Sequence, residues 1–111
     1  MVENIEEINN KTDEEIIKLV RQSDKELYSQ IIKRYQDKLI RYAEYLIGDY
    51  DKASDVVQES FIKAYINLNG FNPNKKFSSW IYRIVHNEAI NLMNKNKRTV
   101  KMDPDIDFDS E

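Results

Sequence analysis

The sequence predicts an all-α protein, a compact bundle of about four helices without a sheet. Apolar residues recur at spacings of three and four over long stretches, which is the period of an amphipathic helix. No stretch alternates apolar and polar residues as a half-buried strand would. The 111 residues are enough for one small domain. We expect a flexible N-terminus over 1–11, a helical domain over 12–101 and an acidic linker or tail over 102–111.

The first predicted helix begins after Thr12, because Thr12 and Glu15 have the spacing of a capping box. The clearest helix spans 25–47, with apolar residues at helical spacing. We expect Tyr35, Tyr42 and Tyr45 to supply buried area within it. Gly48 follows the last periodic residue and is predicted to end this helix.

The next predicted helix covers 51–68, with Asp51 as its N-terminal cap, and has two distinct faces. One face is apolar and is expected to meet the core; it comprises Ala53, Val56, Val57, Phe61, Ala64 and Leu68. The opposite face comprises Asp55, Gln58, Glu59, Ile62 and Ile66. An apolar centre with a polar rim is typical of a protein-binding patch. The alternative is that Ile62 and Ile66 touch another helix of the same domain.

A turn-rich segment, 69–76, separates this helix from the last one. The last helix is predicted to begin at Ser78 or Ser79 as a cap, and its core stripe includes Ile81, Val85 and Ala89. Its opposite stripe is polar and comprises Arg83, Asn87, Asn91, Asn94 and Arg98, flanked by Lys95 and Lys97. Asparagine forms helices poorly, but its amide can both donate to and accept from base edges. The alternative is a general bias of this chain towards Asn, Lys and Ile.

Charge is divided sharply along the chain. Residues 1–68 carry 10 basic and 14 acidic side chains, whereas 69–101 carry seven basic side chains and one acidic one. Residues 102–111 carry five acidic side chains and no basic one. Such asymmetry indicates different partners for different segments, with a nucleic acid for the basic one.

Composition argues against several classes of protein. There is no cysteine and only one histidine, so we expect no disulfide, metal or cofactor. No apolar run approaches a membrane span and the N-terminus is unlike a signal peptide, so we expect a soluble cytoplasmic protein without a membrane partner. No nucleophile–base pair, phosphate loop or metal cluster is visible, and His86 is expected on a helix surface. We therefore predict that the chain is not an enzyme.

Two motifs carry a resemblance to a known family. The run Asp55, Gln58, Glu59 and Phe61 resembles conserved region 2.2 of bacterial sigma factors of the extracytoplasmic-function (ECF) group. The segment from Phe71 through Phe77, Trp80, Arg83 and Asn87 to Asn91 resembles regions 2.3 and 2.4 of the same group. Together the likeness covers about 24–98. It implies the helical sigma region 2 fold.

The resemblance also implies partners. The outer face of 51–68 would bind the β′ coiled coil of core RNA polymerase through Asp55, Gln58, Glu59, Ile62 and Ile66. The last helix and the preceding loop would recognise and open the −10 promoter element, holding an unstacked base of the non-template strand. By position, the resemblance implies that the loop 69–76 forms the base pocket and that Asn87 and Asn91 face bases. With the polar stripe, the predicted DNA-binding residues are Phe71, Asn72, Asn74, Lys75, Lys76, Arg83, Asn87, Asn91, Asn94, Lys95, Lys97 and Arg98. Trp80 would lie mainly in the core beneath the loop. An anti-sigma factor is a further candidate partner.

Two departures from the family pattern stand out. Many members have Asp at position 91 and Arg at position 94, where this chain has Asn. The helix-turn-helix domain that reads the −35 element has no counterpart in the 111 residues. We therefore expect a piece of a longer sigma factor, the alternative being a single-domain relative. The competing function class is a helical protein-interaction module without DNA contact.

Overall fold

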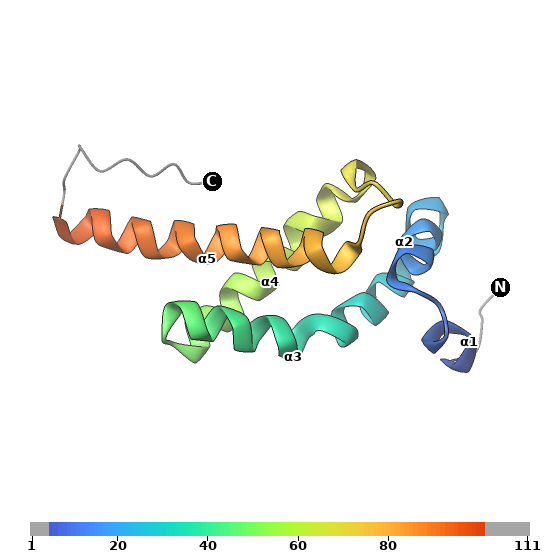
Figure 1. Cartoon of the computed structure of the whole chain (residues 1–111), viewed down its shortest axis with the longest axis horizontal. Coiled ribbons are helices and arrows are strands. Elements are labelled where there is room, and N and C mark those ends of the chain that lie inside the picture. The colour runs from blue at the N-terminus through green and yellow to red at the C-terminus, as the bar shows by residue number, and fades with distance from the viewer. Residues whose placement is uncertain (1–4, 102–111) are drawn as a thin grey trace.

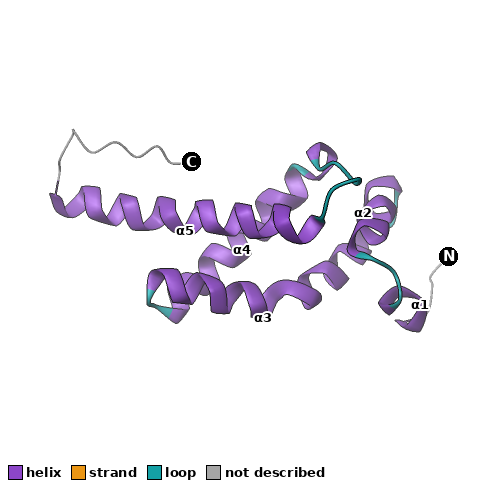
Figure 2. Cartoon of the chain, viewed as in Figure 1, coloured by secondary structure: helices purple, strands orange, loops and turns teal. Residues whose placement is uncertain are grey.

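Residues 5–101 form five α-helices and two short 3₁₀ helices in the computed structural model, which describes this range and the side chains of 6–95. The elements are α1 (Ile5–Asn9), α2 (Asp13–Gln22), η1 (Lys25–Leu27), α3 (Tyr28–Ile47), α4 (Tyr50–Ile66), η2 (Leu68–Gly70) and α5 (Phe77–Lys101). Figure 2 shows helices joined by short loops, and no strand occurs between residues 5 and 101. The predicted all-α class is confirmed. The expected acidic tail, 102–111, lies outside the described residues.

The core lies among α3, α4 and α5, each of which contacts the other two. Figure 1 shows α3 and α5 extended along the long axis with α4 crossing between their ends, and α1 and α2 at one end of the molecule. The predicted apolar face of α4 is buried, as are Leu68 and the core stripe of α5 formed by Ile81, Val85 and Ala89. Ser60 is also buried on α4, and its hydroxyl donates to the Val56 carbonyl at 2.7 Å. This bond satisfies a polar group that would otherwise be costly to bury.

The sequence signals at two helix ends are confirmed. The Thr12 amide donates to Glu15 Oε1 at 2.8 Å, and the Glu15 amide donates to Thr12 Oγ1 at 3.1 Å. Gly48 ends α3 in the left-handed conformation with φ 82°. The cap predicted at Asp51 is wrong, because α4 already begins at Tyr50, so that Asp51 lies within its first turn. Asp49 is the cap instead, accepting from the Lys52 amide at 3.1 Å.

The segment 1–11, which is predicted to be flexible, includes α1, where Ile8 is buried and its carbonyl accepts from Arg34 Nη2 at 3.0 Å. Two further expectations are corrected. Tyr45 is 84% exposed, because it lies two positions after the buried Ala43 and so points to the opposite side of α3. The last helix begins at Phe77, before either predicted serine cap.

None of the helices in the described range is long and apolar enough to cross a membrane.

The end of α3 provides a test of backbone geometry. Gly48→Ala places a Cβ at φ 82° where no atom lies within 4 Å, so the cost is backbone strain alone. We expect a loss of about 1 kcal/mol in the free energy of unfolding, or roughly 4–8 °C in Tm. Gly70→Ala is the control, because Gly70 has open space and no positive φ. Equal effects of the two substitutions in thermal unfolding would contradict this explanation.

Candidate nucleic-acid and protein interfaces

The outer face of α4 is open to solvent. Ile62 is 53% exposed and Ile66 is 72% exposed, although both are large and apolar. The polar residues predicted around them, Asp55, Gln58 and Glu59, are exposed as well. The opposite side of the same helix is buried against α3 and α5, which leaves these five side chains facing outward. The structure therefore does not support the alternative in which Ile62 and Ile66 are covered by another helix of the domain.

An apolar groove of about 580 Å³ runs beside this face, between α3 and α4. Its α4 side includes Phe61, Ile62 and Tyr65, and its α3 side includes Tyr28 and Ile32. The helical spacing of apolar residues over 25–47 does not by itself predict the groove. Its shape depends on how α3 and α4 pack, for which the sequence carries no local signal.

Tyr28 holds the two walls of this groove together. Its hydroxyl donates to the Phe61 carbonyl at 2.7 Å, and its ring lies 5.0 Å from that of Tyr65. Burial raises the pKa of Tyr28, and the neighbouring Tyr65 raises it further. The phenol therefore remains protonated as a hydrogen-bond donor across the neutral pH range.

The loop between η2 and α5 is anchored at both ends by aromatic rings. Phe71 is only 3% exposed and Phe77 is fully buried, and their rings meet edge to face at 5.6 Å. Trp80 lies 5.1 Å from the Phe71 ring and 5.8 Å from the Phe77 ring, beneath the loop. The structure thus places Phe71 in the core, and its ring is not available on the surface where the DNA-binding prediction put it. An aromatic residue beside a glycine turn gives no local signal of which way its ring points.

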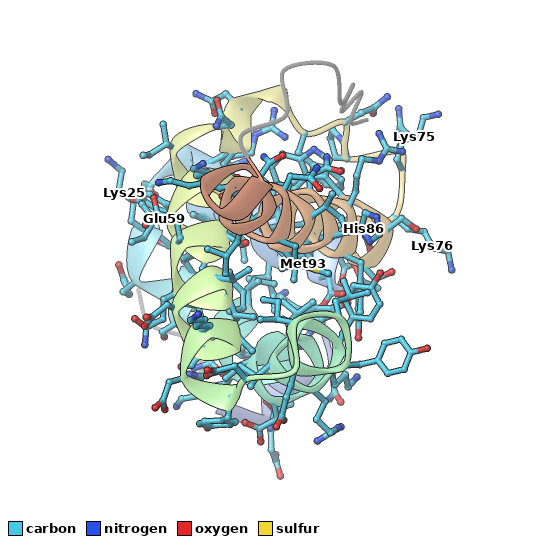
Figure 3. All side chains as sticks on the ribbon, turned by 90° about the vertical axis from the view of Figure 1, so that its left-hand side faces the viewer. Lys25, Glu59, Lys75, Lys76, His86 and Met93 are labelled. Carbon is cyan, nitrogen blue, oxygen red and sulfur yellow. The ribbon has the colours of Figure 1, made fainter. Side chains whose placement is uncertain are left out.

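Between these anchors the loop is exposed and polar. Asn72, Asn74, Lys75 and Lys76 are all exposed. The Asn72 side chain accepts from the Asn74 amide at 2.9 Å, and the Asn72 carbonyl accepts from the Lys75 amide at 2.9 Å. This turn fixes the direction of the chain towards the two lysines. Figure 3 shows Lys75 and Lys76 on the opposite side of the molecule from Lys25 and Glu59.

The polar stripe on α5 is largely exposed. Arg83, Asn87, Asn91 and Lys95 are exposed and Asn94 is half-buried. The predicted contributions of Lys97 and Arg98 fall on side chains outside the described residues. The adjacent His86 is also exposed, as expected, and its Nδ1 lies 2.8 Å from the Tyr42 hydroxyl.

The two predicted surfaces meet along the border between α4 and α5. A groove of about 450 Å³ is lined by Asp55 and Glu59 of α4 and by Asn91 and Lys95 of α5. Beside it, Lys63 of α4 and Glu88 of α5 form a salt bridge at 2.8 Å. The hydrogen bond to Glu88 raises the pKa of Lys63. The sequence predicts the two surfaces separately, because the angle between two helices cannot be read from either one. Within the described part of the chain, no group of three or more His, Cys, Asp or Glu side chains could hold a metal ion.

A family profile described as Sigma-70 region 2 matches residues 31–99, more than half of the chain. The chain belongs to this family. The matched range begins within α3, so it leaves out the helices α1 and α2. The ECF resemblance inferred from the two sequence motifs is also confirmed, because curated relatives of this Sigma-70 region 2 chain are named ECF sigma factors.

One relative is the ECF sigma factor SigW of Bacillus subtilis, 36% identical over 90 residues that make up 81% of this chain and 48% of SigW. Another is the ECF sigma-E factor of Escherichia coli K12, 35% identical over 95 residues, which make up 85% of this chain and 49% of sigma-E. The Sigma-70 region 2 chain thus spans about half the length of these curated relatives.

A solved structure shares the fold. It is the NMR structure of an engineered region 2 of sigmaE in complex with GTAAAA, with a TM-score of 0.74 and 36% sequence identity. The match covers 82% of this Sigma-70 region 2 chain and 95% of the solved chain. The predicted sigma region 2 fold is therefore confirmed over most of the chain.

Burial of Phe71 leads to a test that separates a core role from a surface role. Phe71→Ala should lower the free energy of unfolding by about 3–5 kcal/mol, because it leaves a cavity beside Phe77 and Trp80. Lys75→Ala, in the same loop, should change it by less than about 0.5 kcal/mol. Urea denaturation measures both. A Phe71→Ala protein of unchanged stability would mean that the ring lies outside the core.

Proposed function

We propose that this chain is a transcription initiation module that binds core RNA polymerase and recognises and opens the −10 promoter element. The likeness to the sigmaE region 2 fold, whose solved structure is a complex with GTAAAA, supports this most directly. The partition of charge supports it independently, because the loop and α5 carry nearly all the basic residues of the second half of the chain. Such a module would work in the cytoplasm, where promoter and polymerase meet.

On the DNA side, we assign two roles to the exposed residues. Lys75 and Lys76 attract phosphates, which position a strand without reading its sequence. Asn87 and Asn91 present amides that can pair with base edges. Arg83, Asn94 and Lys95 extend the same surface along α5.

Opening of the promoter requires no hydrolysis in this proposal. Extrusion of a base costs a few kcal/mol of unstacking, and contacts to the extruded base offset that cost. The exposed loop residues Asn72 and Asn74 are the candidates for holding the base.

On the protein side, we assign the outer face of α4 to the β′ coiled coil of polymerase. Ile62 and Ile66 supply apolar area, while Asp55, Gln58 and Glu59 supply a polar rim. The adjacent apolar groove between α3 and α4 extends the area that a partner helix could bury. An anti-sigma factor could occupy the same face in competition with polymerase.

The same groove favours the second candidate, a helical protein-interaction module without DNA contact. A titration with single-stranded DNA at several salt concentrations separates the two candidates. Only the transcription initiation module is expected to bind the DNA, with an affinity that falls as salt rises.

The polymerase assignment is tested at Ile62. Ile62→Lys should abolish binding to an isolated β′ coiled coil, because it places a charge at the centre of the apolar patch. Since Ile62 is half-exposed, the free energy of unfolding should change by less than about 0.5 kcal/mol. Tyr45→Lys is the control, being an exposed apolar residue on α3 outside the patch, and should leave binding intact. Retained binding by Ile62→Lys in calorimetric titration would exclude this residue from the interface.

The DNA assignment is tested by separating base discrimination from salt dependence. Asn87→Ala or Asn91→Ala should lower discrimination at one base position by about 1–3 kcal/mol and leave the salt slope unchanged. Lys75→Ala or Lys76→Ala should weaken all sequences alike and lower the slope by about 0.7 for single strands. The measurement is a panel of −10-like oligonucleotides, each titrated at several salt concentrations. If the asparagine variants weaken every oligonucleotide equally, these residues do not read bases.

A further inference from the structure

Helix α2 holds both ends of the loop that joins η2 to α5. Arg21 Nη1 donates to the Phe71 carbonyl at 2.8 Å, where the loop begins. Glu14 Oε2 accepts from the Phe77 amide at 2.7 Å, where the loop ends. Both bonds are partly buried and join residues at least 50 positions apart. Figure 1 shows this loop reaching towards α2 before it turns into α5.

The bond from Glu14 completes the start of α5. The first amides of a helix have no partner within it, and here a carboxylate from another helix accepts one of them. The bond therefore fixes where the loop stops and α5 starts.

The bond from Arg21 orients the peptide group at the other end of the loop. Phe71 is extended, with φ −76° and ψ 133°, and its carbonyl points to the guanidinium. The Phe71 ring is buried, which holds the side chain in the core but does not by itself orient the backbone carbonyl. What the bond adds is a fixed direction for the chain that leads into Asn72.

A single rigid helix supplies both contacts. Glu14 and Arg21 are seven positions apart, close to two helical turns, and so lie on the same side of α2. Helix α2 is itself held by the buried Ile16 and Ile17. Asp13 at its start pairs with Arg34 of α3 at 2.8 Å. The spacing of the two loop ends is thereby tied to the body of the domain.

We propose that Glu14 and Arg21 are positioning residues that pre-shape the loop for capture of a single-stranded base. The inference rests on the proposed function. A loop with both ends fixed loses less conformational entropy when it binds, so more of its contact energy appears as affinity for the correct strand. Phosphate attraction by Lys75 and Lys76 does not depend on this order. Loss of either bond should therefore reduce discrimination more than it reduces overall binding.

Four variants test the proposal. Glu14→Ala and Glu14→Gln remove the same charge, but only glutamine keeps an oxygen that can accept from the Phe77 amide. Arg21→Ala is paired with Lys18→Ala, which removes a cation from an exposed position on the same helix. Each variant is titrated with the hexamer that the unaltered chain prefers, from a panel that begins with GTAAAA, and with a scrambled hexamer of the same composition. All titrations are made at a temperature at which circular dichroism shows full folding.

Glu14→Ala and Arg21→Ala should each weaken binding of the preferred hexamer about tenfold and leave the scrambled hexamer and the salt slope unchanged within error. Glu14→Gln and Lys18→Ala should bind both hexamers as the unaltered chain does. Equal weakening of both hexamers, or no change in either, would overturn the proposal.

Hydrogen exchange of the free protein tests the same contact without DNA. The Phe77 amide should exchange about tenfold faster in Glu14→Ala and at the original rate in Glu14→Gln. Unchanged exchange in Glu14→Ala would overturn the positioning role even if DNA binds. A third outcome is that the unaltered chain binds no hexamer while the exchange result is as expected. The contacts of α2 with the loop are then confirmed, but the proposed function fails, and the role of Glu14 and Arg21 in base capture is overturned with it.

Discussion

Helix α4 packs against both α3 and α5, and Ala53, Val57 and Ala64 on its inner side are fully excluded from solvent. The small side chains of Ala53 and Ala64 allow neighbouring helices to approach closely. Once this side is buried, the geometry of a helix turns Asp55, Glu59 and Ile62 outward. The same contact places α5 beside α4, so the buried side of one helix sets the position of both candidate interfaces.

Features that depend on helical periodicity or on the chemistry of a helix end could be predicted from the sequence. The two faces of α4 follow from spacing alone, and Ile62 is exposed because it lies opposite Val57 and Ala64. The Thr12 capping box and the left-handed Gly48 follow from residue type at fixed offsets. These signals are local, so they need no knowledge of how the helices pack.

Features that depend on how distant segments meet could not be predicted in this way. The burial of Phe71 requires Phe77 and Trp80 to come together beneath the loop. The shared border of Asp55 and Asn91 depends on the angle between α4 and α5. The Glu14 bond to Phe77 spans 63 positions, and a glutamate in the first turn of a helix is fully explained by that helix alone. No pattern within either segment signals the other.

The loop before α5 faces two opposing requirements under the proposed function. Asn72, Asn74, Lys75 and Lys76 must stay exposed to reach a strand, so burial cannot hold them in one conformation. Order must therefore come from the ends of the loop and from bonds within its own backbone. The structure has both, with Phe71 and Phe77 in the core, Arg21 and Glu14 on the terminal peptide groups and the Asn72 turn between them. A short loop restrained at both ends has few conformations to lose, which allows exposed polar side chains to form a defined site.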